Sequence, residues 1–458
     1  MNSKKFFTTR EKKGPYRFLV PAAKLYSEKI TKTNSDFYLY KHKRISLKSI
    51  FFIFKIIFSG KIFFKKNLMK INYRGYNLSR YAMPEVYKNF KSYLSKSIFY
   101  YELVKSFYWT SMTVDDGLAA KGVETAFIDH GMYRNGLLME IFSKKNILVF
   151  TLGYPRGFFF ISHQTNSKIK YENIIQLNKS KKLNSTQIKL AKKTIVEVIS
   201  KTEKFPWMKN IKFKDNLETD LKDITHVVYV HTFTDTQMIY GYDGFLNVYE
   251  WFNFTMGELT KNNKNKILVK AHPCFFHEKF PNKNAEYDRK LFFKITSKYL
   301  QNKNVLILKE PIRNKKLLQK ISKKTILISH HGSVVLESLF IGFKIIASSA
   351  AFWNEDFKLA NKWKNIPEYK IQLKKNWSNL EFCNKSDLLN ASYQLFCLPC
   401  GIYGKKYWEN ILINELKISK SALFETPVKT LQKAKVSDVN FKKIIKSVSK
   451  TIEFIKTK

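Results

Sequence analysis

Short apolar runs alternate with helix-length segments between residues 265 and 349. The runs at 267–270, 305–308, 325–329 and 344–347 are too short for helices, and the stretches between them are long enough for one. This spacing is typical of parallel strands, because parallel neighbours must be joined by a crossover connection. We therefore predict an α/β fold with a parallel sheet in this part of the chain.

Polar loops follow two of these predicted strands. Residues 270–273 read Lys-Ala-His-Pro, and residues 330–333 read His-His-Gly-Ser. Ligands of open α/β sheets bind beyond the carboxyl ends of the strands, so both loops are expected at one binding edge. Ser333 would cap a helix over 334–341 whose N-terminal N–H groups attract phosphate, and Glu337 would accept hydrogen bonds from sugar hydroxyls. Either loop alone also fits an ordinary turn or cap, and their combination at one edge favours a site.

A second α/β rhythm precedes this one. The pattern predicts strands at 106–110, 124–128 and 147–151, with helices at 114–121 and 134–143. A further strand at 225–230 and a helix at 243–258 would begin the second sheet. We predict two Rossmann-like domains in four regions: a basic aromatic N-terminal region at 1–95, a first domain at 96–215, a second domain at 216–400, and a C-terminal helical segment at 401–458.

The charge of the chain is strongly positive. Its 458 residues include 82 Lys and Arg against 36 Asp and Glu, which gives a formal net charge of +46. Such a charge favours anionic partners such as nucleotides, acidic glycans and anionic membrane surfaces. No zinc-finger spacing, RNA-binding aromatic motif or helix-turn-helix pattern is present, so nucleic acid is not the expected partner. The four cysteines, two of them in a Cys-Leu-Pro-Cys sequence at 397–400, are interpreted as free thiols in a reducing cytoplasm.

The most apolar stretch, residues 49–64, is interrupted by Lys55, Gly60 and Lys61. It is shorter than the roughly 20 residues that a membrane-spanning helix needs. Its mixture of Phe, Ile and Lys fits an amphipathic segment in a membrane interface, and a buried core helix fits it equally well. The start of the chain lacks a secretory apolar region. We therefore expect a cytoplasmic protein that associates peripherally with the inner membrane face.

The sequence VKAHPC, followed by SHHGSVVLESLFIGFKII, resembles the nucleotide-binding half of the capsule polysaccharide biosynthesis family. These are GT-B glycosyltransferases related to bacterial Kdo transferases. The likeness extends upstream to VVYVHTFTDTQMIYGYDGFLNVYEWF and AFIDHGMYRNG, and covers roughly residues 100–355. It implies a GT-B-like fold in which the two Rossmann-like domains face a cleft, with an acceptor-side domain at 96–215 and a nucleotide-sugar domain at 216–400. It also implies a transferase that acts in capsule or lipopolysaccharide synthesis, with a CMP-activated acidic sugar such as CMP-Kdo as donor and a glycan or glycolipid as acceptor.

The resemblance also implies roles for individual residues. In the family, the His of the His-Pro motif and the helix after the Ser/Gly-rich loop contact the nucleotide phosphate, and a Glu of that helix contacts ribose. These roles fall on His272, Ser333 and Glu337. The full set of candidate nucleotide-binding residues is Lys270, His272, Pro273, His331, Gly332, Ser333 and Glu337.

The chain contains no Asp-x-Asp motif, which many glycosyltransferases use to hold a metal at the donor diphosphate. We therefore expect no metal cofactor, and an inverting single displacement in which a helix N-terminus, His and Lys stabilise the leaving phosphate. A base must take the acceptor proton. Asp129 is the first candidate, beside His130 in a tight turn, Asp235 is the second, and Asp115 with Asp116 comes third. Tyr133 and Arg134 are the candidate acceptor-binding residues.

Two other functions remain open. A polyol-phosphate transferase that uses CDP-glycerol would share the architecture. Alternatively, the Rossmann-like domains are the scaffold of a basic protein that binds membranes or nucleic acid without catalysis.

Overall fold

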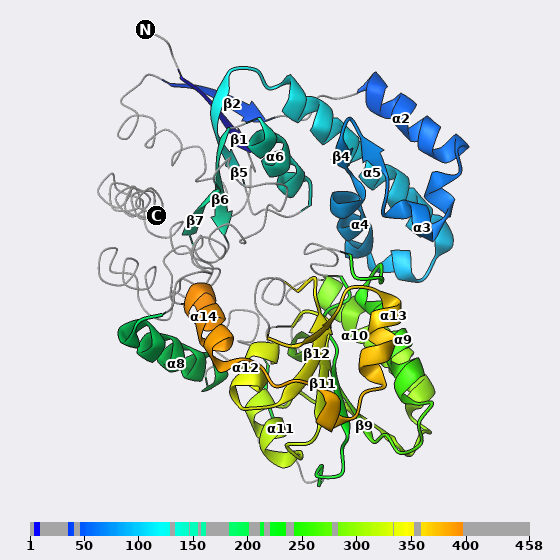
Figure 1. The fold of residues 1–458 in the computed structure, drawn as a ribbon. Coiled ribbons are helices and arrows are strands. Elements are labelled where there is room, and N and C mark those ends of the chain that lie inside the picture. The colour runs from blue at the N-terminus through cyan, green and yellow to red at the C-terminus, as the bar shows by residue number, and fades with distance from the viewer. Residues whose placement is uncertain are drawn as a thin grey trace. The chain divides into compact units, whose positions relative to one another are not determined.

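The computed structural model of the chain describes residues 4–9, 35–40, 46–128, 133–145, 147–153, 157–161, 183–200, 211–214, 220–234, 242–276, 283–332, 334–351 and 359–396. The chain divides into two compact units (Figure 1). Unit 1 takes residues 1–82, 103–181 and 394–458, and unit 2 takes residues 83–102 and 182–393. The predicted C-terminal helical segment at 401–458 and the Cys-Leu-Pro-Cys sequence lie outside the described residues.

Unit 1 contains a five-stranded sheet with the strand order β2-β1-β5-β6-β7. Three neighbouring pairs are parallel, and the edge strand β7 runs antiparallel to β6. The strands β1 and β2 come from the basic aromatic N-terminal region, in which the sequence pattern predicted no strands. The sheet strands are β1 (Lys4–Thr9), β2 (Ser35–Tyr40), β5 (Val123–Ile128), β6 (Leu148–Gly153) and β7 (Gly157–Ile161).

The predicted strand at 106–110 is wrong, because these residues lie inside the long helix α5 (Lys96–Ala119). Buried positions such as Leu103, Phe107 and Val114 recur at helical spacing. Thr110 is buried and its hydroxyl donates to the carbonyl of Ser106 (2.8 Å), which satisfies its polar group within the helix. The aromatic, β-prone composition of this stretch is therefore overridden by packing.

The other elements of unit 1 include three helices of 12, 10 and 12 residues. Helix α6 confirms the helix predicted at 134–143. The elements are α2 (Leu47–Phe58), the 3₁₀ helix η3 (Lys61–Phe63), α3 (Lys65–Leu68), the hairpin of β3 (Asn72–Tyr73) and β4 (Tyr76–Asn77), α4 (Ser79–Lys88), which continues into unit 2, and α6 (Tyr133–Lys144). Among the described residues, no helix combines the length and the hydropathy that a bilayer span requires.

Unit 2 contains a six-stranded sheet in which every neighbouring pair is parallel. Its order is β10-β9-β8-β11-β12-β13. Numbered along the chain, this is the order 3-2-1-4-5-6 of doubly wound nucleotide-binding folds, and it reverses direction between β8 and β11. The strands are β8 (His226–Tyr229), β9 (Ile267–Lys270), β10 (Val305–Leu308), β11 (Ile326–Ser329), β12 (Lys344–Ser348) and β13 (Asn361–Trp363). The predicted α/β fold class with Rossmann-like sheets is confirmed.

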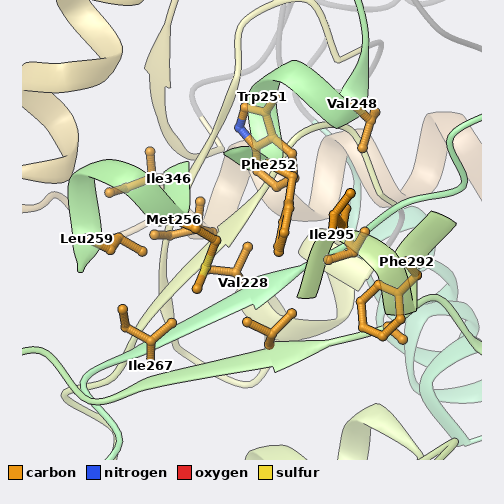
Figure 2. Packing of buried hydrophobic residues seen from close by; sticks show 14 of the residues in the cluster. Val228, Val248, Trp251, Phe252, Met256, Leu259, Ile267, Phe292, Ile295 and Ile346 are labelled. Carbon is orange, nitrogen blue, oxygen red and sulfur yellow. The ribbon is translucent and has the colours of Figure 1, made fainter. Parts of the chain in front are cut away.

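Helices cover this sheet and supply a large part of its core. Figure 2 shows Trp251, Phe252 and Met256 of α9 packed over Val228 and Ile267 of the sheet. The helices are α8 (Ser185–Ser200), α9 (Val248–Leu259), α10 (Lys283–Thr296), α11 (Asn314–Lys320), α12 (Val334–Phe340), α13 (Ile366–Leu373) and α14 (Lys385–Phe396), the last of which ends in unit 1. The described residues of this unit also form four 3₁₀ turns: η4 (Phe90–Tyr93), η7 (Pro273–Phe276), η8 (Ser297–Tyr299) and η9 (Trp377–Asn379).

Helix α9 starts five residues later than the predicted start at residue 243. Asn247 caps the helix by accepting from the N–H of Glu250 (2.8 Å), while the Glu250 carboxylate accepts from the N–H of Leu246 (3.2 Å). The arrangement is close to a capping box, except that the carboxylate accepts from the N–H one residue before the cap. Gly244 before it has a φ of +107°, where a side chain would also collide with the backbone of Ile366. Asp243 is therefore left in a loop, where its carboxylate faces other partners.

Candidate functional site

A pocket of about 100 Å³ lies at the carboxyl ends of β8, β9 and β11, where the strand order of unit 2 reverses. It is the place at which doubly wound folds bind ligands. Helices α11 and α12 close it through Asn314 and Glu337. Of the predicted nucleotide-binding residues, Lys270, His272, Pro273, Gly332 and Glu337 line the pocket, His331 lies outside its lining, and Ser333 lies outside the described residues.

Lys270 is the last residue of β9, and its side chain is buried. Burial lowers the pKa of the ammonium to about 8, against the opposing charge of Glu337. The ammonium lies 6.0 Å from the ring centroid of Tyr229, another pocket residue. No ion pair joins Lys270 to Glu337. A buried cation of this kind is costly, and an anionic ligand in the pocket would offset the cost.

Glu337 is a buried residue of α12. Burial raises its pKa to about 7, against the lowering effects of the Asn314 hydrogen bond and the Lys270 charge. The amide of Asn314 donates to Glu337 Oε2 (3.2 Å), and its oxygen accepts from the hydroxyl of Tyr229 (2.8 Å). This series of hydrogen bonds holds the Glu337 carboxylate in place at the pocket wall, and its Oε1 is still able to accept a hydrogen bond.

His272 has a defined tautomer. Its Nδ1 accepts from the backbone N–H of Cys274 (3.2 Å), so the neutral ring carries its proton on Nε2. The ring lines the pocket and lies 5.1 Å, centroid to centroid, from that of His231. Its Nε2 is therefore a hydrogen-bond donor, which suits an anionic oxygen.

Four histidines gather at these strand ends. His231 lies 4.2 Å from His331 between ring centroids, and the Nδ1 atoms of His330 and His331 are 2.6 Å apart. Burial, together with the charges of His231, His330 and His272, holds the pKa of His331 well below its usual range. His331 is therefore neutral. In the described part of the chain, no group of three or more His, Cys, Asp or Glu residues has an arrangement that would hold a metal ion.

Asp243 holds one of these four histidines, His330, in place. Its carboxylate accepts from Nε2 of His330 (2.9 Å) and from the hydroxyl of Ser348 (2.5 Å). Burial raises the pKa of Asp243, but the charge and hydrogen bond of His330 and the bond from Ser348 outweigh this and hold it below its usual value. Asp243 is thus an ionised, buried carboxylate that fixes the orientation of His330.

The loop after β8 is also anchored. Asp288 of α10 accepts from the backbone N–H groups of Phe233 (3.2 Å) and Thr234 (3.1 Å) and from the hydroxyl of Thr234 (3.0 Å). These bonds fix the backbone two residues after His231. The second candidate base, Asp235, follows directly and lies outside the described residues.

Gly332 lies in the lining of the pocket, just after the end of β11. Its N–H donates to the hydroxyl of Ser329 (3.3 Å), so this N–H is engaged within the protein. A Cβ at Gly332 would lie 3.2 Å from the same hydroxyl. The absence of a side chain at Gly332 therefore permits this close contact with Ser329.

In unit 1, the candidate base Asp129 and its neighbour His130 lie outside the described residues. Tyr133, a candidate acceptor residue, is buried and has a φ of +54° at the start of α6. The Arg134 guanidinium lies 5.6 Å from the ring centroid of Trp109.

Asp115 is not at the start of a helix, as its sequence suggested, but well inside α5. Its carboxylate accepts from the hydroxyls of Ser46 (2.7 Å), Ser49 (3.1 Å) and Tyr73 (3.0 Å) and from the guanidinium of Arg74 (2.8 Å). Burial alone would raise the pKa of Asp115, and these four donors hold it below its usual value. A carboxylate so fully engaged has a structural role and is poorly suited to accept a proton.

Sequence reasoning missed Asn314, Tyr229, Asp243 and His330 as parts of the site. Asn314 and Tyr229 come from segments without a recognisable motif, and only the topology brings them to Glu337. His330 gave a signal, because it is one of two adjacent histidines that follow a predicted strand.

No protein-family profile and no curated protein sequence matches this chain. Among solved structures, similarity is found to the Thermosulfurimonas dismutans KpsC, a beta Kdo 2,4 transferase (11% identity, TM-score 0.37, 60% of this chain and 81% of that chain). It is also found to the Methanocaldococcus jannaschii UDP-GlcNAc 2-epimerase in complex with UDP-GlcNAc and UDP (12%, 0.27, 84% and 97%). A third is an E. coli trehalose-6-phosphate protein bound with UDP-2-fluoro glucose (9%, 0.27, 90% and 99%).

Proposed function

We propose that the chain is a glycosyltransferase of surface polysaccharide synthesis, with the donor nucleotide bound in the pocket of unit 2. The observation that carries this proposal is the pairing of buried Lys270 with buried Glu337 in one pocket without an ion pair between them. Burial disfavours the charged form of both groups, so together they indicate a ligand with one polar group for each. A nucleotide offers a phosphate for the cation and ribose hydroxyls for the carboxylate.

The volume of the pocket limits what it encloses. At about 100 Å³ it is smaller than the roughly 300–1,000 Å³ of sites that enclose a whole ligand, so it accommodates only part of a nucleotide. We assign the phosphate to the ammonium of Lys270 and Nε2–H of His272, and the ribose to Glu337. Pro273 and Gly332 shape the wall beside these groups.

The donor that we favour is a CMP-activated acidic sugar such as CMP-Kdo. The proposed reaction is a single displacement with inversion. The acceptor oxygen forms a bond to the anomeric carbon, the bond from that carbon to the phosphate oxygen breaks, and its electron pair leaves with CMP. The acceptor proton passes to a base, for which Asp129 is the first candidate and Asp235 the second. Lys270 and His272 would stabilise the leaving phosphate without a metal.

The acceptor is a glycan or glycolipid under this proposal, and the enzyme works in the cytoplasm at the inner membrane face. The charge of +46 supports an anionic surface as its working environment. Tyr133 and Arg134 remain proposed acceptor residues. The burial of Tyr133 favours Arg134 as the one that would touch an acidic acceptor directly.

A thermal-shift panel of CMP, CDP, UDP and GDP tests the nucleotide, because a ligand that binds only the folded state raises the melting temperature. We expect CMP to give the largest shift, and turnover of CMP-Kdo to persist in EDTA. Turnover of CDP-glycerol alone would identify a polyol-phosphate transferase instead. A strict requirement for Mg²⁺ or Mn²⁺ would contradict the metal-free mechanism. If the protein binds polyanions in a salt-sensitive way and no nucleotide changes its melting temperature, it is a binding protein and not an enzyme.

A further inference from the structure

Helix α2 of unit 1 carries a stripe of exposed apolar side chains. Leu47, Phe51, Phe54 and Phe58 are 68%, 72%, 52% and 83% exposed. Their spacing of four, three and four residues places them on one line along the helix, since 3.6 residues make a turn. Isolated exposed apolar residues are ordinary, whereas a continuous stripe of this size marks an interaction surface.

The opposite face of α2 is fixed to unit 1. Phe52, Ile53 and Ile56 are buried. Ser46 and Ser49 at the start of the helix both donate to the carboxylate of Asp115 in α5. Figure 1 shows α2 in blue beside α5. The helix is therefore held in a defined rotation, and the exposure of the phenylalanines follows from how α2 is docked.

Basic residues surround the stripe. Lys48 and Lys55 are exposed and lie roughly a quarter turn from it on the same side of the helix. After the turn at Gly60, Phe63 and Phe64 are also exposed. The chain has no acidic residue between Asp36 and Glu85. The exposed lysines of this segment are Lys48, Lys55, Lys61, Lys65, Lys66 and Lys70.

We infer that α2 and the residues after it, to Phe64, form a docking surface for an anionic phospholipid membrane. Aromatic side chains would enter the boundary between headgroups and acyl chains, while lysines contact lipid phosphates. The charge of the segment decides between partners, because a second copy of this chain would bring the same six lysines against its own. The inference concerns where the protein works and does not depend on which reaction it catalyses.

Flotation of the full-length protein with vesicles, without nucleotide, tests this surface. Vesicles of phosphatidylcholine with phosphatidylserine are compared with phosphatidylcholine alone, at low and high salt. We expect binding to the anionic vesicles at low salt, and weaker binding to neutral vesicles or at high salt. If the wild-type protein does not float with anionic vesicles at low salt, the inference is wrong.

A triple variant locates the surface. Phe51→Ser/Phe54→Ser/Phe58→Ser removes exposed rings only, so the fold should be retained, and the bound fraction should fall at least about tenfold. The matched control is Leu94→Ser/Leu300→Ser/Ile371→Ser, which removes three exposed apolar side chains elsewhere and should float like wild type. Equal flotation of the phenylalanine variant and wild type would overturn the assignment.

The lysines need their own variant. Lys48→Gln/Lys55→Gln/Lys61→Gln should reduce binding to anionic vesicles and flatten its salt dependence, while binding to neutral vesicles stays unchanged. Gel filtration, done in parallel, tests whether a second copy of this chain covers the stripe instead of a membrane. A wild-type dimer that the phenylalanine variant converts to a monomer, without any flotation, would show that the stripe joins two copies and would overturn the membrane proposal.

Discussion

Asp243 Oδ2 lies 2.9 Å from Nε2 of His330, and this contact determines which ring nitrogen of His331 carries the proton. An ionised Asp243 accepts from His330, so a neutral His330 has only a lone pair at Nδ1. His331 must then donate from its own Nδ1 across the 2.6 Å contact, which leaves its Nε2 as an acceptor. A second proton on His330 reverses the bond and turns Nε2 of His331 into a donor. The hydrogen bond between Asp243 and His330 therefore determines whether Nε2 of His331 accepts or donates a hydrogen bond.

The first prediction concerns Asp243→Asn. The change preserves the shape of the side chain but removes the negative charge that accepts hydrogen bonds from His330 and Ser348. The free energy of unfolding should therefore fall by about 1–3 kcal/mol. Urea denaturation measures it, and the nitrogen chemical shifts of His331 report the change of tautomer. The control Ser348→Ala removes one hydrogen bond to Asp243 and should cost about 1 kcal/mol without altering the tautomer. A variant as stable as wild type, with unchanged shifts, would refute the coupling.

The second prediction concerns His272. His272→Ala should weaken CMP binding about tenfold or more while the melting temperature of the free protein stays close to wild type, because one charge-assisted hydrogen bond is lost from a half-buried side chain. His272→Gln retains an N–H donor and should recover part of the affinity. Calorimetric titration with CMP measures both variants. Wild-type affinity in His272→Ala would mean that the His-Pro loop is structural.

The third prediction separates structure from catalysis at Asp115. Its four donors tie α2 and the β3–β4 hairpin to α5, so Asp115→Asn should lower the free energy of unfolding by about 1–3 kcal/mol. Turnover at a temperature where the variant is folded should be near wild type. Asp129→Asn should show the reverse, with turnover reduced by about 10²–10⁴-fold and stability unchanged. Loss of turnover in Asp115→Asn without destabilisation would restore it as a candidate base.

The parallel sheet of unit 2 was predictable because its strands carry a signal at short range. The apolar runs at β9, β10, β11 and β12 match their predicted bounds within a residue or two. These strands are buried on both faces of the sheet. Each therefore appears in the sequence as a continuous apolar run, without the alternation of apolar and polar residues that marks a half-exposed strand. The helix before β5 was misassigned as a strand at 106–110 because short aromatic runs occur in both element types.

The site was only partly predictable, for a different reason. Lys270, His272 and Glu337 follow motifs at strand ends, and topology requires those ends to meet. Asn314 contacts Glu337 from a helix 23 residues earlier in the chain, and nothing local marks it. The charge states were also beyond the sequence, because the shifts of Lys270 and Glu337 arise from burial that only packing creates.

The fourth prediction concerns Lys270→Met. Because burial lowers the pKa of Lys270 to about 8, the folded protein carries a desolvated ammonium at pH 7 that the unfolded chain would hydrate. Methionine of similar length removes this cost, so the free energy of unfolding should rise by about 1–2 kcal/mol. CMP affinity should fall at least about tenfold, since a phosphate loses its charged partner. A variant that is less stable than wild type would show that the ammonium is satisfied within the protein.

The last prediction is the pH dependence that Glu337 imposes. Its pKa is raised by burial from 4.5 to about 7, so between these values the folded state holds a proton on Glu337 that the unfolded chain has lost. Stability therefore falls as the pH rises through this window, by roughly 3 kcal/mol from this group, and is level below and above it. Glu337→Gln cannot lose that proton, and so removes this component.

The measurement is the difference in free energy of unfolding between Glu337→Gln and wild type, taken from urea denaturation at pH 5 and pH 8, because groups common to both proteins cancel in the difference. We expect the variant to gain relative to wild type between the two pH values. An equal difference at both would mean that the carboxylate titrates as an exposed group does. CMP should narrow the gap at pH 8, since ribose hydroxyls supply the hydrogen bonds that the buried carboxylate lacks in the free protein.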